Sequence, residues 1–253
     1  MTTDRSKLRS DEPLAAEFTA VIKTGQSGRL RELLASDPRL ALCVVEDQKG
    51  GGRPPLHLLA DWPGHNPNAA ETVQILAAAG ADLNGAAVAM WHRETALHWA
   101  ASSDDVTLID ALLDAGADIE HDGSSIDGGP PLSSAVGYGQ WAAARRLVER
   151  GARTQLWHEA ALGLMPALTR RFEADPAPDA DTLSGAFWNA CHGGQLATAR
   201  YLLERGADLN WLAPWTGQTP LDIAEKAERH DVAAWLLENG ATRGEKSDGA
   251  DCT

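Results

Sequence analysis

Apolar residues recur along the chain in short segments that each end at a glycine. Five segments carry apolar residues three and four positions apart, the spacing of a helix with one buried face. Each runs into a Gly-Ala pair, at Gly80, Gly116, Gly151, Gly206 and Gly240. Glycine directly after an amphipathic segment is typical of a helix C-terminus, because it adopts the left-handed backbone conformation without strain. The pattern therefore predicts five helices, each closed by a glycine.

These glycines also define a period. Successive intervals are 36, 35, 55 and 34 residues, so three of the four share one repeat length. The long interval contains residues 155–176, which keep two short helical segments but lose the closing glycine phrase. We expect this segment to be a degenerate extra repeat. A fixed period of this length predicts stacked units, each too small to bury its apolar face alone.

A shorter apolar segment precedes each of the five helices. These segments read PPLHLLA (54–60), TALHWAA (95–101), PPLSSAV (130–136), GAFWNAC (185–191) and TPLDIAE (219–225). Thr or Pro at the start supplies a cap or a preset φ for a helix. The helix pairs with their Thr-Pro-Leu-His-like start resemble the ankyrin repeat, most closely from Thr95 and from Thr219, and the detailed pattern is similar to a bacterial-type ankyrin subfamily. The resemblance covers roughly residues 52–243.

The resemblance implies an all-α ankyrin-repeat solenoid of helix-turn-helix units with finger loops. We expect a single domain over residues 14–243, with about six repeats after an N-terminal helical cap at 14–51. Residues 1–13 and 244–253 have little to bury and are expected to be disordered. The repeats are expected near 52–84, 94–120, 129–154, 155–176, 183–210 and 217–243.

Charge and cysteine usage narrow the partners and the compartment. The chain has 22 basic and 36 acidic residues, a net charge of −14, which repels phosphate backbones and anionic lipid surfaces. We therefore expect neither nucleic acid nor a membrane as a partner. Three cysteines without metal-ligand spacing, and a start without an apolar leader, favour a cytoplasmic protein. No motif for a metal or a cofactor is present, and we expect neither.

The aromatic composition indicates a binding surface. Nine Trp stand beside three Phe and two Tyr. Family geometry implies that inner-helix residues and finger loops form a concave face, on which small residues such as Ser134, Gly137 and Gly163 lie between larger ones and suggest a recess. The candidate ligand-binding residues are Trp62, Trp91, Trp99, Ser102, Ser134, Tyr138, His158, Asn189 and Trp215.

Two functions are compatible with this face. The first is recognition of a protein or peptide partner by the concave face and finger loops. The alternative is a small-molecule pocket, either for binding alone or with metal-free acid–base chemistry of the isomerase, cyclase or hydrolase type, in which Glu159 pairs with His192 or Asp61.

Other polar residues are expected to be structural. His57 and His98 stand at the motif position whose histidine bonds to neighbouring backbone in the family. Asp105 is expected to cap a helix. The outer-helix arginines Arg145, Arg146 and Arg200 are expected to form a solvated convex face.

Overall fold

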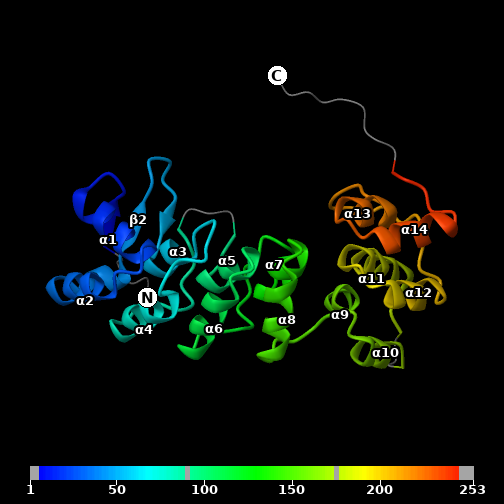
Figure 1. Cartoon of the computed structure of the whole chain (residues 1–253), viewed down its shortest axis with the longest axis horizontal. Helices are drawn as coiled ribbons and strands as arrows, with labels where there is room; N and C mark the ends of the chain where they lie inside the picture. Colours follow the sequence, from blue (N-terminus) through cyan, green and yellow to red (C-terminus); the bar gives the residue numbers. More distant parts are fainter. Residues whose placement is uncertain (1–5, 89–91, 174–176, 245–253) are drawn as a thin grey trace, which may run out of the picture. The chain divides into compact units, whose positions relative to one another are not determined.

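A computed structural model describes residues 6–88, 92–173 and 177–244 of the chain (Figure 1). The chain divides into two compact units, Met1–Arg153 and Thr154–Thr253. The single repeat domain expected over 14–243 stays a prediction. The division falls at the start of the degenerate repeat, residues 155–176.

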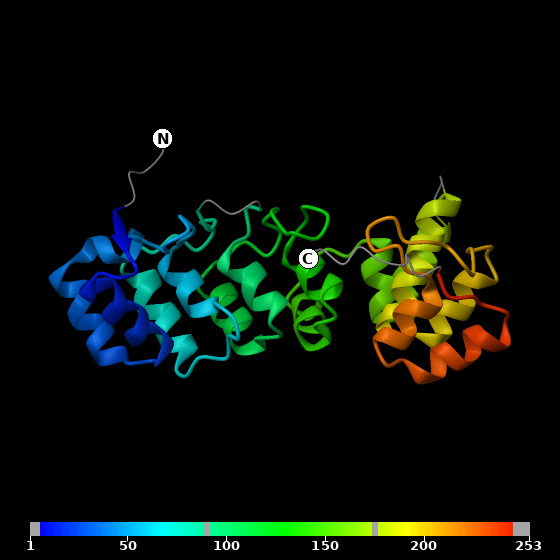
Figure 2. The same ribbon diagram turned by 90° about the horizontal axis from the view of Figure 1, so that it is seen from above.

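The first unit stacks helix pairs in two rows. The helices α1, α3, α5 and α7 pack on one another in chain order, and α2, α4, α6 and α8 form the second row (Figures 1 and 2). Their bounds are Pro13–Lys23 (α1), Ser27–Ser36 (α2), Pro55–Ala60 (α3), Ala69–Ala78 (α4), Ala96–Ser102 (α5), Val106–Asp114 (α6), Pro131–Gly137 (α7) and Trp141–Glu149 (α8). The pair α1 and α2 stands where the N-terminal cap is expected.

A small sheet lies beside the first helix pair. It has the strand order β1 (Lys7–Arg9), β2 (Val44–Glu46) and β3 (Gly52–Arg53), with β1 parallel and β3 antiparallel to β2. A 3-10 helix, Pro38–Leu42, leads into β2. The expected disorder over residues 1–13 is therefore wrong for β1, because its backbone is paired with β2.

The second unit consists of three further helix pairs in its described part. The inner helix α11 packs against both α9 and α13, and α10, α12 and α14 each pack on the inner helix before them. The bounds are Leu156–Leu162 (α9), Met165–Glu173 (α10), Ala180–Gly193 (α11), Leu196–Leu203 (α12), Pro220–Lys226 (α13) and His230–Glu238 (α14). The degenerate segment 155–176 thus holds a helix pair, α9 and α10. Of the expected C-terminal tail, residues 245–253 lie outside the described residues.

The helix ends follow the local sequence. Thr95 and His98 form a reciprocal capping box at the start of α5, and Thr219 and Asp222 do the same at α13. Asp105 caps α6, as expected, by accepting a hydrogen bond of 3.0 Å from the Leu108 N–H. The closing glycines adopt positive φ, for example 101° at Gly116. Short capped helices therefore arise where the sequence predicts them.

One hydrogen bond recurs between successive repeats. His57 Nε2 donates to the carbonyl of Glu94 at 3.0 Å, and His98 Nε2 donates to the carbonyl of Gly129 at 3.2 Å. In the second unit Trp188 Nε1 donates to the carbonyl of Gln218 at 3.1 Å. Each acceptor directly precedes the cap of the next inner helix. The expected structural roles of the two histidines are confirmed, and the indole of Trp188 plays the same role.

Burial in the second core predicts the cost of truncation. Leu221 is fully buried among helices α11, α13 and α14, so Leu221→Ala is expected to lower the free energy of unfolding by about 2–5 kcal/mol. The matched control Leu212→Ala removes an exposed side chain and should change it by less than about 0.5 kcal/mol. Urea unfolding followed by circular dichroism measures both values. Equal losses in the two variants would contradict the assigned core.

Candidate functional site

Two exposed aromatic side chains follow inner helices of the first unit. Trp62 lies just after α3 and is 83% exposed, while Tyr138 is the C-cap residue of α7 and is 51% exposed. The Tyr138 hydroxyl is within hydrogen-bonding distance of Ser125 Oγ, at 3.0 Å, in the loop before α7. Both residues are therefore available to a partner. Trp91, a third candidate, lies outside the described residues.

Trp99 is held between two repeats. Its Nε1 donates to the carboxylate of Glu94 at 3.1 Å, and its ring contacts the His57 imidazole edge-on at a centroid distance of 4.9 Å. The other carboxylate oxygen of Glu94 accepts a hydrogen bond of 2.8 Å from the Ser125 N–H. Ser102, one turn further along α5, donates to the Trp99 carbonyl. Trp99 is thus half-buried and anchored, with part of its ring available to a partner.

Asp61 is engaged in ion pairs. One of its carboxylate oxygens lies 2.8 Å from Lys23 Nζ and the other lies 3.5 Å from Arg53 Nε. These contacts tie α1 and β3 to the end of α3. They give the carboxylate a structural role at this position.

The small residues of the inner face are covered by their neighbours. Ser134 is fully buried, with its hydroxyl 2.8 Å from Ser124 Oγ. A Cβ on Gly137 would lie 2.7 Å from the Ile126 side chain, so the preceding loop packs directly over this glycine. Gly163 adopts a φ of 69° at the end of α9 and lies against the Gln195 side chain. The expected recess is filled at these positions, because the small side chains admit close packing.

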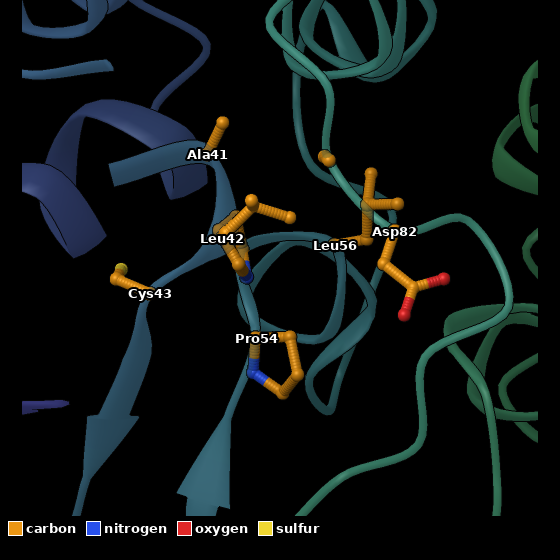
Figure 3. Close-up of a pocket in the computed structure, with 8 residues that line it drawn as sticks. Ala41, Leu42, Cys43, Pro54, Leu56 and Asp82 are labelled. Atoms are coloured by element: carbon orange, nitrogen blue, oxygen red, sulfur yellow. The ribbon is translucent and has the colours of Figure 1, made fainter. Parts of the chain in front are cut away.

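A pocket in the first unit lies away from the candidate residues. Leu42, Pro54 and Leu56 gather around it in Figure 3, with Asp82 at its edge. Its volume is about 10 Å³, which is room for about one water molecule. None of the predicted site residues lines it.

In the second unit Glu159 is buried in an ion pair. Its two carboxylate oxygens accept hydrogen bonds from Arg171 at 2.8 and 2.9 Å, and one also accepts a bond from the Thr154 hydroxyl at 2.7 Å. Arg171 comes from α10 and also donates to the Thr154 carbonyl. The partner of Glu159 is therefore Arg171, which replaces the expected pairing with His192.

Two buried histidines of this unit, His158 and His192, are held neutral. Burial, together with the nearby Arg171 charge, lowers the pKa of His158 to about 3. Burial and the charges of Arg229 and Lys226 lower the pKa of His192 to about 4. His158 Nδ1 accepts a hydrogen bond of 3.1 Å from the Gln155 N–H, the reciprocal cap of α9. The acid–base hypothesis requires an imidazole that takes up a proton near neutral pH. Neither His158 nor His192 does so.

Asn189 is also engaged within its own helix. Its side-chain amide donates to the Gly185 carbonyl, one turn earlier in α11, at 2.9 Å. The residue is almost fully buried. Its side chain therefore contributes little surface to a partner.

Three indoles form a cluster on the second unit. Trp215, in the finger loop before α13, contacts Trp188 at a centroid distance of 5.6 Å and Trp211 at 5.5 Å, both edge-to-face. Trp215 is 59% exposed, and Leu212 in the same loop is 54% exposed. We call Trp188, Trp211, Leu212 and Trp215 the finger aromatic patch.

The base of this patch is fixed by hydrogen bonds. Trp211 Nε1 donates to the Asp181 carboxylate at 2.9 Å, and Trp188 donates to the Gln218 carbonyl. The Trp188 ring also contacts His192 at 5.6 Å. Sequence reasoning identified Trp215 but missed Trp188 and Leu212 as site residues. The available signal was an indole at the motif position that holds His57 and His98 elsewhere.

The ion pair of Glu159 generates a stability prediction. Arg171→Ala leaves a buried carboxylate without its cation and is expected to lower the free energy of unfolding by about 2 kcal/mol or more. The control Arg170→Ala removes the neighbouring exposed cation, which has no ion pair among the described residues, and should cost less than about 0.5 kcal/mol. Urea unfolding at neutral pH measures the difference. Equal stability of the two variants would contradict the assigned role of Arg171.

The low pKa of His158 predicts acid destabilisation. Between the ordinary value of 6.5 and about 3, the unfolded chain binds a proton that the folded chain does not. The stability from neutral His158 is therefore complete above pH 6.5 and falls on acidification, by at most about 1.4 kcal/mol per pH unit. His158→Asn keeps an acceptor for the Gln155 N–H but does not titrate. Its loss of stability between about pH 7 and pH 5, measured by urea unfolding, should be smaller than that of the wild type; an identical loss would contradict the shift.

Comparison with known proteins agrees with this architecture. A family model described as ankyrin repeats (3 copies) matches residues 56–157 and 160–247. Among solved structures, the crystal structure of the human ASB11 ankyrin repeat domain is similar, with a TM-score of 0.52 and 20% sequence identity over 91% of this chain and 99% of that chain. None of the curated proteins matches the sequence, and no helix in the described residues is long and apolar enough to cross a membrane. The stacked helix pairs, the capping boxes and the matched repeats show that the chain belongs to the ankyrin repeat family.

Proposed function

We propose that this protein is a recognition module that binds a protein or peptide partner through its inner helices and finger loops. Ankyrin repeats are in general protein-interaction modules, and this supports the class of function. We further propose that the main contact is made by the finger aromatic patch of the second unit. The partner segment would then present an apolar or aromatic side chain to Trp215 and Leu212.

The observation that carries this proposal is the combination of exposure and support at Trp215. The indole is mostly exposed, yet its ring is braced by Trp188 and Trp211. An aromatic side chain held in this way offers much contact area while losing little conformational entropy on binding. Exposed indoles of this kind are enriched among the residues that dominate binding energy at interfaces.

The contacts of the other candidates support recognition rather than acid–base chemistry. Glu159 is paired with Arg171, and Asp61 with Lys23 and Arg53. Trp99 and Tyr138 remain candidates for additional contacts on the first unit.

We also propose that the protein works in the cytoplasm. Cys43 and Cys191 are free thiols buried in the cores of the two units. Burial raises the pKa of Cys43 to about 12, so its thiol stays protonated and unreactive. Unpaired cysteines of this kind suit a reducing compartment.

Selection of peptides tests the binding proposal. A phage-displayed library of random linear peptides is selected on the full chain, and the enriched peptide is measured by fluorescence anisotropy. Trp215→Ala is expected to weaken binding at least about tenfold, because it removes the centre of the patch. Its melting temperature should stay within a few degrees of the wild type, since the side chain is exposed.

The matched control is Trp62→Ala, which removes an even more exposed indole from the first unit. We expect Trp62→Ala to change the affinity for the selected peptide by less than about threefold, which is on the order of the error of the anisotropy measurement. Equal affinities of Trp215→Ala and the wild type would contradict the proposal. So would the absence of any enriched peptide on the wild-type chain.

A further inference from the structure

The outer helices of the second unit carry an arginine held on aromatic rings. Arg205 follows the end of α12 and is exposed. Its guanidinium carbon lies 3.4 Å from the centroid of the Tyr201 ring and 5.8 Å from the centroid of the Phe172 ring of α10. The two rings contact each other edge-to-face at 5.7 Å. The guanidinium is therefore stacked on a platform built from two helices.

Arg205 differs from most outer-helix arginines of this protein. In the first unit Arg31 pairs with Glu71 at 2.9 Å, and Arg146 pairs with Asp110 at 2.8 Å. Arg205 has no carboxylate partner among the described residues; its hydrogen bond goes to the Tyr201 carbonyl at 3.2 Å. Arg200 also lies over a ring, that of Trp235 at 5.9 Å, whereas the Arg205 guanidinium contacts two rings and lies closer to one of them. Among the residues that the structure describes, no carboxylate contacts this guanidinium, so its donors are available to an anion from a partner.

The geometry points to a carboxylate as this anion. We propose that Arg205, stacked on Tyr201 and Phe172, binds an Asp or Glu side chain in an acidic peptide segment of a partner protein. A guanidinium that is stacked on an aromatic face keeps its N–H edge free, and that edge matches a carboxylate in a bidentate arrangement. The exposed parts of the two rings would contact an apolar neighbour of the acidic residue.

Other anions fit this site less well. A doubly charged phosphate is usually held by a cluster of arginines, whereas the Tyr201 and Phe172 platform holds one guanidinium. A nucleic acid requires a basic surface that follows many phosphates, and the net charge of this chain repels such a polyanion. A short acidic segment requires neither a cluster of arginines nor an extended basic surface. This surface consists of outer-helix residues, and the proposal is independent of the finger aromatic patch.

Fluorescence anisotropy with labelled peptides tests the inference on the full chain. The probe is a peptide of alternating Glu and Leu, compared with the same peptide carrying Gln in place of Glu. We expect saturable binding of the Glu peptide only. Arg205→Ala should weaken this binding about tenfold, and Arg205→Lys should weaken it severalfold, because lysine keeps the charge but not the planar donor edge.

Two controls separate the specific contact from general charge. Arg170→Ala removes an exposed cation from the neighbouring helix α10 and should leave the affinity within about twofold, as should Tyr201→Phe, which keeps the ring. Trp215→Ala should also leave it unchanged, so this proposal and the finger-patch proposal fail separately.

Several outcomes would overturn the inference. These are equal affinities of Arg205→Ala and the wild type, an equal loss in Arg170→Ala, or no binding of the Glu peptide. Tighter binding of a phosphoserine version of the peptide, or of a single-stranded oligonucleotide, would show that the site binds a phosphate instead of a carboxylate. Loss of fold in Arg205→Ala, detected by its melting curve, leaves Arg205→Lys as the deciding variant.

Discussion

The structure depends on how one repeat is joined to the next. No helix pair of this size buries its own apolar face, so each repeat is stable only against its neighbour. Successive repeats are joined by a hydrogen bond. A side-chain N–H on one inner helix donates it to the backbone carbonyl just before the cap of the next inner helix. His57 and His98 supply it in the first unit, and Trp188 supplies it in the second. The same contact sets the position of the next finger loop.

The use of an indole for this contact links stability to recognition. A histidine in this position satisfies the carbonyl and adds little surface. Trp188 satisfies the same kind of carbonyl and also presents a ring against which Trp215 packs. The finger loop before α13 is therefore braced by the bond that joins the repeats. The exposed Trp215 is held in place by the fold instead of being a mobile side chain.

Much of the fold could be predicted from the sequence because its signals are local. The closing glycines, the capping boxes at Thr95 and Thr219 and the periodic apolar positions each act within one repeat. The partner of Glu159 could not be predicted in this way. Arg171 lies on the following helix, and its approach depends on how α10 packs on α9. The pairing that the sequence suggested, between Glu159 and His192, rested on the spacing of inner helices alone.

Packing also decided the features of the candidate site that the sequence left open. Small residues on the inner face suggest a recess. In the structure, however, the Ile126 side chain packs over Gly137, and the Ser134 hydroxyl is hydrogen-bonded to that of Ser124. Such coverage depends on the path of a loop, which composition does not specify. Likewise, the place of Trp188 beneath Trp215 follows only from the conformation of the finger loop. Division of the chain into two units was also not apparent from the repeat period.

The finger aromatic patch is the surface that we propose recognises a partner. The most direct test is an NMR titration of the full chain with the selected peptide, following the indole N–H signals assigned by single Trp→Phe variants. We expect the signals of Trp215 and Trp211 to move or broaden on saturation, while those of Trp62 and Trp141 stay in place. Movement confined to the indoles of the first unit would contradict it.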